Sequence, residues 1–366
     1  MLQETSSPLE LPFDVHPDPD EFIRAAMDWH FSPDTGSPFW LEQAKSFEFE
    51  PRTDVKCFAD LTLFPNVANE LRHTRAEDLI PKGYGSRPDV VGVFESGGTT
   101  GAPKRVVLLR DWCDRVVASS VAHMNAQGVP MNRNWLALAP SGPHMAGELM
   151  NQQAAALGGI RFAIDIDPRW VKKLIAAGKL DEVQAYTDHI LEQAAFVLRT
   201  QDVGVVLPTP PLLELLARRD DLMDLVHQKA DAILWGGAHM GPDTRHLFRT
   251  EIFPGVKLYG SYSSTMILGG AQERLGLTDD DPCIFDPLSP YITFSVVDPA
   301  TGDTVRHGER GQVVMNHVSK SFLMPNNLER DIATRIVGPV GQIGDSVADV
   351  TPVQRFEGGD VIEGVY

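Results

Sequence analysis

Short hydrophobic runs alternate with amphipathic stretches along most of this chain. Runs with the length and the branched or aromatic content of buried strands occur at 90–94, 105–109, 135–140, 203–208, 232–235 and 256–260. The stretch 111–128 has helical periodicity, with Asp111 as its predicted N-cap and Gly128 near its end. A second helix is predicted at 180–201, where apolar side chains form one stripe. The alternation predicts βαβ units on a largely parallel sheet, and hence an α/β fold.

The hydrophobic pattern changes after about residue 285. The segment 291–305 predicts a hairpin with its turn at Pro299–Asp303, and 308–318 predicts a further strand. The first ninety residues are rich in proline and aromatic residues and show few clear periods. We therefore predict an α/β body up to about residue 285, followed by a β-rich section.

Composition and charge exclude some classes of partner. The chain has 366 residues and a formal net charge of −18. This charge argues against a nucleic-acid partner, which needs basic patches, and disfavours binding to anionic membranes. No apolar run approaches the roughly 18 residues that a membrane-spanning helix needs.

The three cysteines predict no disulfide framework. Cys57, Cys113 and Cys283 lie far apart and form no C-x-x-C pair, so they are interpreted as reduced thiols and not as metal ligands. The first residues show neither a basic region nor an apolar region typical of a signal peptide. The sequence therefore predicts a cytoplasmic protein.

A glycine-rich segment, ESGGTTGAPKRV, joins two of the predicted strands between Glu95 and Val106. Its glycines and hydroxyl groups allow backbone N–H groups and Lys104 to converge on a phosphate. A glycine-rich hairpin with exposed threonines explains the same residues equally well. A Walker A loop is excluded, because Lys104 follows Pro103, precedes Arg105 and leads into a strand instead of a helix.

The order S-G-G-T-T-G-A-P-K resembles the phosphate loop of the adenylate-forming superfamily, which includes acyl-CoA synthetases, luciferases and nonribosomal adenylation domains. Further segments match that superfamily in order and spacing: WGGAHM (235–240), LYGSYSST (258–265), DPATGDTVRHGERGQVV (298–314) and LERDIAT (328–334). The last is similar to the form found in phenylacetate–CoA ligases. The resemblance spans roughly residues 85 to 335 and implies the large N-terminal domain of that fold, with packed mixed sheets, helices and a β-rich distorted barrel.

The resemblance implies a role for each matching residue. ATP phosphates, together with Mg²⁺, would be held by the loop residues Ser96, Gly97, Gly98, Thr99, Thr100, Gly101 and Lys104. The adenine would be enclosed by Gly236, Gly237, Ala238, Tyr259, Gly260 and Ser261, and Asp331 would bind the ribose. The reacting phosphate and the acid would be contacted by Ser263, Ser264, Thr265, Trp235 and His144. A lone histidine such as His144 is also common as a structural residue.

The sequence departs from the superfamily pattern in two places. Ser263 stands where an acidic residue usually helps to hold Mg²⁺; Glu273 is a candidate substitute, although a surface carboxylate is the commoner interpretation. Few residues follow Asp331, so we expect residues 1–330 to form the N-terminal domain and 331–366 a short tail in place of the small C-terminal domain. No lysine follows Lys320, so Lys104 is the expected site lysine and thioester formation is not expected.

These features predict an enzyme that adenylates a carboxylic acid with ATP, most simply an aromatic acid. The short length resembles that of adenylating proteins of phenazine antibiotic biosynthesis, which act on griseoluteic acid ahead of its reduction. A reductase or another acyl acceptor would then be the partner. Bacterial bioluminescence acyl-protein synthetases are a rival, but they use a cysteine near the C-terminus, and the last cysteine here is Cys283. A nucleotide-binding protein without catalysis, or one that obtains its lysine from a partner, is the alternative.

Overall fold

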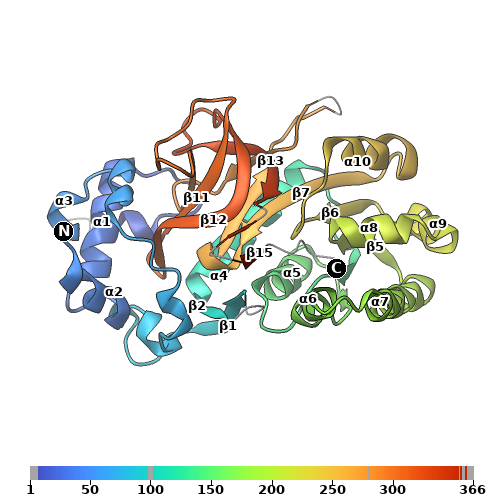
Figure 1. Ribbon diagram of the computed structural model, residues 1–366, viewed down its shortest axis with the longest axis horizontal. Coiled ribbons are helices and arrows are strands. Elements are labelled where there is room, and N and C mark those ends of the chain that lie inside the picture. The colour runs from blue at the N-terminus through green and yellow to red at the C-terminus, as the bar shows by residue number, and fades with distance from the viewer. Residues whose placement is uncertain (1–6, 98–101, 279–280, 354, 357–358, 361–366) are drawn as a thin grey trace.

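A mixed β-sheet runs from beside the helical N-terminal segment into an α/β half of the molecule, where it is covered by helices (Figure 1). The computed structural model describes residues 7–97, 102–278, 281–353, 355–356 and 359–360. In these residues the sheet has eleven strands in the order β10-β11-β12-β13-β9-β8-β7-β6-β5-β3-β4. Parallel pairing joins β3 (Asn134–Leu138), β4 (Arg161–Ala163), β5 (Val203–Pro208), β6 (Ala232–Trp235) and β7 (Lys257–Ser264).

Helices cover both faces of this parallel half. They are α4 (Arg110–Ala126), α5 (Met145–Ala156), α6 (Pro168–Ala176), α7 (Leu180–Thr200), α8 (Pro210–Ala217), α9 (Asp220–Lys229) and α10 (Pro242–Leu247), which continues into a π-helical turn, η7 (Phe248–Ile252). Alternate strand residues enter different clusters: Trp135 and Val205 pack with α4 and α5, whereas Leu136 and Val206 pack with α7, α8 and α9. Strands buried on both faces are typical of parallel sheets, and the predicted βαβ alternation is confirmed.

The antiparallel half follows β7 and contains the strands predicted after residue 285. Its strands are β8 (Gly269–Glu273), β9 (Ile284–Pro287), β10 (Ile292–Val297), β11 (Arg310–Val318), β12 (Leu323–Ile336) and β13 (Ser346–Pro352). The predicted turn is present, because the N–H of Gly302 donates to the carbonyl of Asp298. The boundary predicted between residues 330 and 331 falls inside β12, and β13 pairs with both β12 and β9. The sheet therefore continues well past that boundary, and β14 (Arg355–Phe356) pairs with β15 (Gly359–Asp360) beyond it.

The glycine-rich segment joins a separate hairpin, β1 (Val90–Ser96) and β2 (Lys104–Leu109), which pair antiparallel. The predicted strand–loop–strand arrangement is thus confirmed. The predicted burial of the run 90–94 is wrong for most of its length. Phe94 is buried, but Val90 and Val93 are exposed because β1 lies outside the main sheet.

The start of α4 also differs from the prediction. Leu109 holds the N-cap position and no side chain caps the helix there. The predicted cap, Asp111, lies in the first turn and accepts a hydrogen bond from the hydroxyl of Tyr84. The end agrees with the prediction, because α4 stops at Ala126 and Gly128 adopts a left-handed conformation, with φ of 79°.

Residues before β1 form a helical segment that packs on the β11–β12 turn. Its helices α1 (Pro19–Phe31), α2 (Pro38–Gln43) and α3 (Pro51–Asp54) each begin at a proline that follows a capping side chain. Indole N–H groups of Trp29 and Trp40 donate to the carbonyls of Lys320 and Leu323, at 2.7 and 3.1 Å. Short 3₁₀ turns connect the rest: η1 (Pro8–Glu10), η2 (Ala44–Ser46), η3 (Phe58–Leu63), η4 (Glu70–Arg72), η5 (Ala76–Leu79) and η6 (Lys82–Tyr84).

Two buried histidines join this segment to the sheet. His30 contacts the carbonyl of Ser319 at 2.7 Å through Nε2, and His317 contacts the Ser319 hydroxyl at 2.7 Å and the Ile267 carbonyl at 2.5 Å. A carbonyl accepts, so each histidine uses one ring N–H as a donor. Burial lowers the pKa of His30 to about 4 and that of His317 to about 3, although the bonded carbonyls oppose the shift. Both rings are therefore uncharged at neutral pH.

Acidification below pH 6.5 is expected to destabilise the protein through these two histidines. Unfolded histidine binds a proton near its ordinary pKa of 6.5, whereas the folded state excludes that proton until a much lower pH. Their stabilising contribution is thus complete above 6.5 and falls with pH, by about 1.4 kcal/mol per pH unit for each histidine.

Urea unfolding across this pH range measures the effect. The variant His30→Gln keeps a donor for the Ser319 carbonyl, and its stability should depend less steeply on pH. His73 is exposed, so His73→Gln serves as the control and should keep the original slope. An unchanged slope in His30→Gln would contradict the prediction.

Among the described helices, none combines the length and apolar character needed to cross a membrane.

Candidate functional site

The segments that carry the sequence motifs meet where β7 ends. Strand β7 runs into a 3₁₀ turn, η8 (Thr265–Ile267), and both strands of the glycine-rich hairpin contact that turn. Ser264 links the two, because its hydroxyl accepts the backbone N–H of Met266 at 3.3 Å. Ser263 is exposed and Thr265 half-buried, so both lie at the edge of the sheet beside the hairpin.

Two side-chain hydrogen bonds connect the end of β7 to β12. Tyr262 donates its hydroxyl to Oδ2 of Asp331 at 2.8 Å, and Ser264 donates to Oε1 of Glu329 at 2.7 Å. Burial first, and then the charge of Asp331, raises the pKa of Tyr262 well above its ordinary value, so the phenol remains a donor. These bonds bring the LYGSYSST and LERDIAT segments together, as their shared resemblance requires.

The structure places the predicted Tyr259 away from this cluster. Tyr259 is 4% exposed and packs with Trp135 and Val205 on the face covered by α4 and α5, so it has no open surface for a ligand. The tyrosine that reaches Asp331 is Tyr262, which the sequence analysis missed. The signal was present, because the pattern Tyr–small residue–Ser occurs twice in succession, at 259–261 and 262–264.

The ends of β6 and β7 approach each other closely, as predicted. A Cβ atom on Gly236 would lie 2.9 Å from the hydroxyl of Ser261, and Gly237 turns the chain with a φ of 79°. Gly237 is exposed, and Gly236, Ala238 and Ser261 are half-buried, so this strand end borders open space. Glycine is required at these positions by close approach and by the backbone conformation, respectively.

Trp235 and Gly260 occupy the opposite face of the same strands. Trp235 is 5% exposed, contacts Phe285 edge-on and lies over Gly260, where a Cβ atom would come within 2.5 Å of its ring. Its Nε1 has no hydrogen-bond partner in the described part of the chain. These contacts make Trp235 a core residue instead of a residue that faces the open strand end.

The glycine-rich hairpin places Ser96 and Lys104 opposite each other, next to the loop. Gly97 is exposed with a φ of 76°, a left-handed conformation that glycine adopts without strain. The remaining predicted loop residues, Gly98, Thr99, Thr100 and Gly101, lie outside the described residues. The hairpin geometry thus brings one hydroxyl and one ammonium group to the same end of β1 and β2.

Glu95 fixes α6 against this hairpin. Its two carboxylate oxygens accept from Arg105 at 3.0 Å and from Arg169 at 2.7 Å. Burial opposes ionisation, but these two arginines hold the pKa of Glu95 below its ordinary value. His144 precedes α5 in the same region; burial, and then the charge of Arg169, lowers the pKa of its ring. His144 is therefore a neutral imidazole beside the hairpin at neutral pH.

Lys172 of α6 is a second lysine in this region, which the sequence analysis missed. Burial, followed by the positive charge of Arg330, lowers the pKa of Lys172 to about 8. Arg330 lies between Glu329 and Asp331 in β12, so Lys172 is close enough to the LERDIAT segment to be affected by its charge. Nothing in the local sequence around Lys172 indicates this position, because it depends on how α6 docks.

Glu273 is neither a surface carboxylate nor part of the site. It is 1% exposed, and its Oε1 accepts from Arg245 at 2.5 Å and from Arg249 at 2.7 Å, while Oε2 accepts the N–H of Gly260 at 2.7 Å. The suggestion that Glu273 replaces the missing acidic residue is therefore wrong, because all its bonds are to the protein interior. No group of three or more His, Cys, Asp or Glu residues is placed to hold a metal within the residues described.

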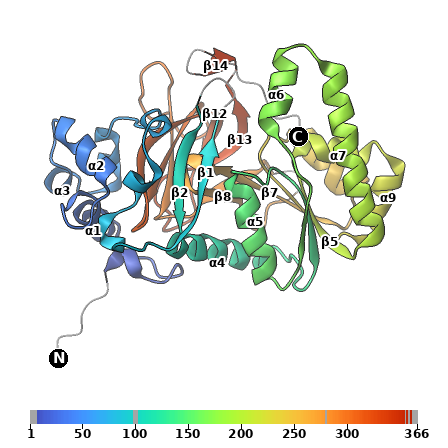
Figure 2. The ribbon, with the colours of Figure 1, turned by 90° about the horizontal axis from the view of Figure 1, so that it is seen from below.

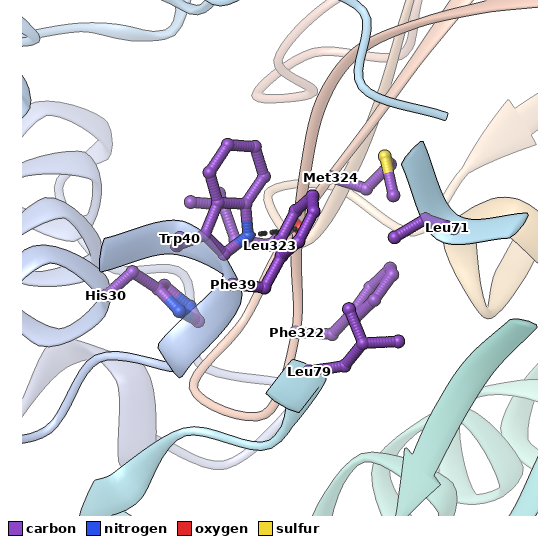
Figure 3. Close-up of a pocket in the computed structure, with 8 residues that line it drawn as sticks. All are labelled: His30, Phe39, Trp40, Leu71, Leu79, Phe322, Leu323 and Met324. Carbon is purple, nitrogen blue, oxygen red and sulfur yellow. Dashed lines mark hydrogen bonds between the residues drawn. The ribbon is translucent and has the colours of Figure 1, made fainter. Parts of the chain in front are cut away.

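One cavity is too small to be the candidate site. It lies in the N-terminal segment beside His30 and has a volume of about 10 Å³, enough for about one water molecule (Figure 3). Its walls are mainly apolar side chains, and Figure 3 shows Phe39 between Trp40 and Phe322. It is too small for a nucleotide or an acid.

Comparison with solved structures shows the fold. The structure of 2-hydroxyisobutyryl-CoA ligase in complex with 2-HIB-AMP and CoA, in the thioesterification state, superposes with a TM-score of 0.64 at 16% sequence identity. The match covers 94% of this chain and 73% of that one. The postadenylation state of the same ligase gives a TM-score of 0.62. This chain has the fold of the adenylate-forming ligases. The predicted fold class, the large N-terminal domain of such ligases, is thereby confirmed.

Comparison of sequences agrees with the fold. The chain is 26% identical over 235 residues to 4-coumarate–CoA ligase-like 6 of Oryza sativa subsp. japonica. That match covers 62% of this chain but 37% of the rice protein, so the chain spans little more than a third of this relative. No protein-family profile matches the chain. The similarity supports the adenylate-forming superfamily in general and does not single out the phenylacetate–CoA ligase branch.

Proposed function

We propose that this protein uses ATP to convert a carboxylic acid into an acyl-adenylate, with release of pyrophosphate. The observation that carries the proposal is the pair of bonds from Tyr262 to Asp331 and from Ser264 to Glu329, beside the glycine-rich hairpin. They join a hydroxyl-rich strand end to a carboxylate suited to a ribose. Similarity to acyl-CoA ligases in fold and in sequence supports the same reaction class.

We infer that ATP binds through the charged groups and hydroxyls at the edge of the sheet beside the hairpin. Asp331 would accept hydrogen bonds from the ribose hydroxyls, with Tyr262 holding its carboxylate in place. Lys104 and Ser96 would bind the outer phosphates through a positive charge and a hydroxyl. Gly236, Gly237 and Ala238 at the end of β6 would lie against the adenine.

Mg²⁺ would accompany ATP and neutralise part of the phosphate charge. In nucleotide sites this ion usually takes one or two carboxylates together with phosphate oxygens and water. Glu329, which is half-buried and already turned toward Ser264, fits that requirement better than exposed Ser263 does. Glu329 would thus replace the acidic residue that the strand end lacks.

The adenylation step requires that the acid and ATP are positioned for reaction and that the developing charge is stabilised. A carboxylate oxygen of the acid attacks the α-phosphorus in line; a new O–P bond forms, and the bond to the bridging oxygen of pyrophosphate breaks. Thr265 would donate to an α-phosphate oxygen as charge develops there, whereas the single O–H of Ser264 already donates to Glu329. His144, a neutral imidazole near the hairpin, would contact the acid. The acid would be aromatic, of phenazine carboxylate type, and its adenylate would pass to a reductase or another acyl acceptor.

A nucleotide-binding protein without turnover is the second candidate, favoured by exposed Ser263 in place of an acidic residue. Exchange of labelled pyrophosphate into ATP, measured with a panel of aromatic and aliphatic acids, separates the two. Acid-dependent exchange is the expected result. Binding of ATP by calorimetry without exchange for any acid would overturn the enzymatic function and favour the second candidate. Adding CoA in the same assay tests whether the acyl group passes to a thiol.

A further inference from the structure

Helix α6 is held in place by its apolar side. Val171 and Leu174 are buried and pack with Val183 of α7, and Figure 2 shows α6 alongside the first part of that helix. At the start of α6, the carboxylate of Asp167 accepts the backbone N–H of Arg169 at 2.9 Å. These contacts fix the helix without using its lysine side chains.

Two cationic side chains lie next to each other on α6. Arg169 and Lys172 are three residues apart, which makes them neighbours on the surface of a helix. Nη2 of Arg169 donates to Oε2 of Glu95 at 2.7 Å, and Glu95 precedes Ser96 at the end of β1. Arg169 thus places this side of α6 beside the end of the hairpin where Ser96 and Lys104 pair.

Lys172 is also close to the segment proposed to bind the ribose. Burial, and then the charge of Arg330 in β12, lowers the pKa of Lys172, so the two cations are near enough to repel each other. Asp331, the proposed ribose acceptor, is the next residue of that strand. The phosphate chain of a nucleotide held by Asp331 and by the hairpin would extend between these two segments, and Lys172 lies near both.

The donors of these two side chains are not satisfied by the protein. Lys172 is half-buried, yet its ammonium group forms no hydrogen bond or ion pair with any residue that the structure describes. Nε of Arg169 is buried and likewise lacks a hydrogen-bond partner among those residues. A buried donor without a partner costs free energy, and two such donors side by side suit an anion that can accept from both.

Positive charges are concentrated around α6 without full compensation. Glu95 accepts from Arg105 as well as from Arg169, so a single carboxylate serves two guanidinium groups. Lys172 and Arg330 add charges that repel each other. Bringing cations together in this way costs free energy, and an anion with several negative charges, such as a triphosphate, would offset that cost.

We propose that Lys172 is a phosphate-binding residue of the adenylation site, which donates to the phosphate chain of ATP and stabilises the charge on the departing pyrophosphate. The electron pair of the broken P–O bond stays on pyrophosphate, and a fixed ammonium group favours that product. Arg169 would bind the same chain through its Nε. The inference rests on the proposed adenylation and adds to it a helix that none of the sequence motifs includes. One cation would come from the hairpin, Lys104, and one from α6.

Substitutions at two adjacent lysines test the proposal. Lys172→Met keeps an unbranched apolar side chain and removes the charge, and Lys173→Met makes the same change at an exposed position of the same helix. In pyrophosphate exchange, Lys172→Met should lower kcat/KM for ATP by about 10- to 100-fold, the effect of losing one hydrogen bond to a charged group. Lys173→Met should change it by less than about twofold, as expected of a surface position. Equal values for the two variants would overturn the assignment.

Urea unfolding distinguishes phosphate binding from a structural role. Methionine removes a half-buried charge that has no partner among the described residues, so Lys172→Met should be at least as stable as the unmodified protein. Lys172→Arg keeps a positive charge and should recover part of the lost activity. Activity that falls only together with stability, and that arginine does not recover, would make Lys172 a packing residue and overturn the proposal. If Lys172→Met does not fold, Lys172→Gln replaces it, with the same expected result.

Calorimetry with inorganic pyrophosphate and Mg²⁺ separates a failure of this inference from a failure of the adenylation itself. This probe carries the phosphate charge without the ribose, the adenine or the acid. The unmodified protein and Lys173→Met should bind it equally, and Lys172→Met about tenfold or more weakly. If exchange is absent for every acid but this difference remains, the enzymatic function is wrong and the anion site on α6 holds. Equal binding by Lys172→Met and Lys173→Met would overturn the assignment of Lys172, whatever the exchange assay shows.

Discussion

Replacing Glu273 with glutamine is expected to lower the free energy of unfolding by about 3–5 kcal/mol, the usual cost of breaking a buried ion pair from one side. Arg245 is 3% exposed and Arg249 is partly buried, and both point their guanidinium groups at Oε1 of Glu273. A neutral amide removes the negative charge that faces Arg245 in a region from which water is excluded. It also replaces one of the two carboxylate oxygens with an NH₂ group, which cannot accept a hydrogen bond.

Urea unfolding at neutral pH measures this loss. Glu192 is exposed on α7, so Glu192→Gln makes the same chemical change at the surface and should alter stability by less than about 0.5 kcal/mol. A loss below about 1 kcal/mol for Glu273→Gln would mean that water or a rearranged side chain compensates the arginines. Because the Gly260 N–H also bonds to Glu273, the variant is further expected to loosen β7 near the proposed site.

Asp331→Ala is expected to lower kcat/KM for ATP in pyrophosphate exchange by about 100-fold, since hydrogen bonds to a charged group each contribute about 1.5–3 kcal/mol. The change removes the proposed ribose acceptor and leaves the Tyr262 hydroxyl without its bond to the carboxylate. Asp331→Asn retains an acceptor oxygen for Tyr262 but loses the negative charge. We expect an intermediate loss for this variant, with stability close to that of the unmodified protein.

Comparison with Asp303→Ala, an exposed carboxylate in the turn after β10, controls for the removal of charge alone. That variant should keep full activity. Calorimetry with ATP distinguishes binding from chemistry, because a ribose contact contributes to the affinity for ATP itself. If Asp331→Ala bound ATP normally and lost activity only through unfolding, Asp331 would be a structural partner of Tyr262 and not a nucleotide-binding residue.

The local pattern of the chain sufficed for its strands and most of its helices. Runs such as 203–208 are apolar over their whole length because β5 is buried on both faces, and that requirement is visible in the sequence. The glycine-rich hairpin was predictable for a similar reason, since glycine and proline limit the backbone locally. The predictions were wrong where tertiary contacts determine the structure. The run in β1 resembles a buried strand, but β1 forms a separate sheet with β2, and Asp111 bonds to Tyr84 instead of capping α4.

Some features of the candidate site could likewise be predicted from the sequence, and others could not. The segments 258–265 and 328–334 were recognisable because their residue order resembles motifs of the adenylate-forming superfamily. The sequence did not show which tyrosine contacts Asp331. Residues of a strand alternate between its two faces, and only the position of β12 decides between Tyr259 and Tyr262. The burial of Glu273 likewise depends on two arginines that lie at least 24 residues away in the chain.

By itself, then, the sequence determined the class of fold, the order of its elements and the stretches that carry hydroxyl, glycine and carboxylate groups. Those properties follow from periodicity and from local backbone limits, which act over a few neighbouring residues. The tertiary structure alone decided which of these groups meet, that Glu273 is an interior counter-ion, and that Lys172 of α6 lies near Arg330 of β12. Such contacts join residues from distant parts of the chain, and their free energy depends on burial and charge compensation that exist only after the sheet has formed.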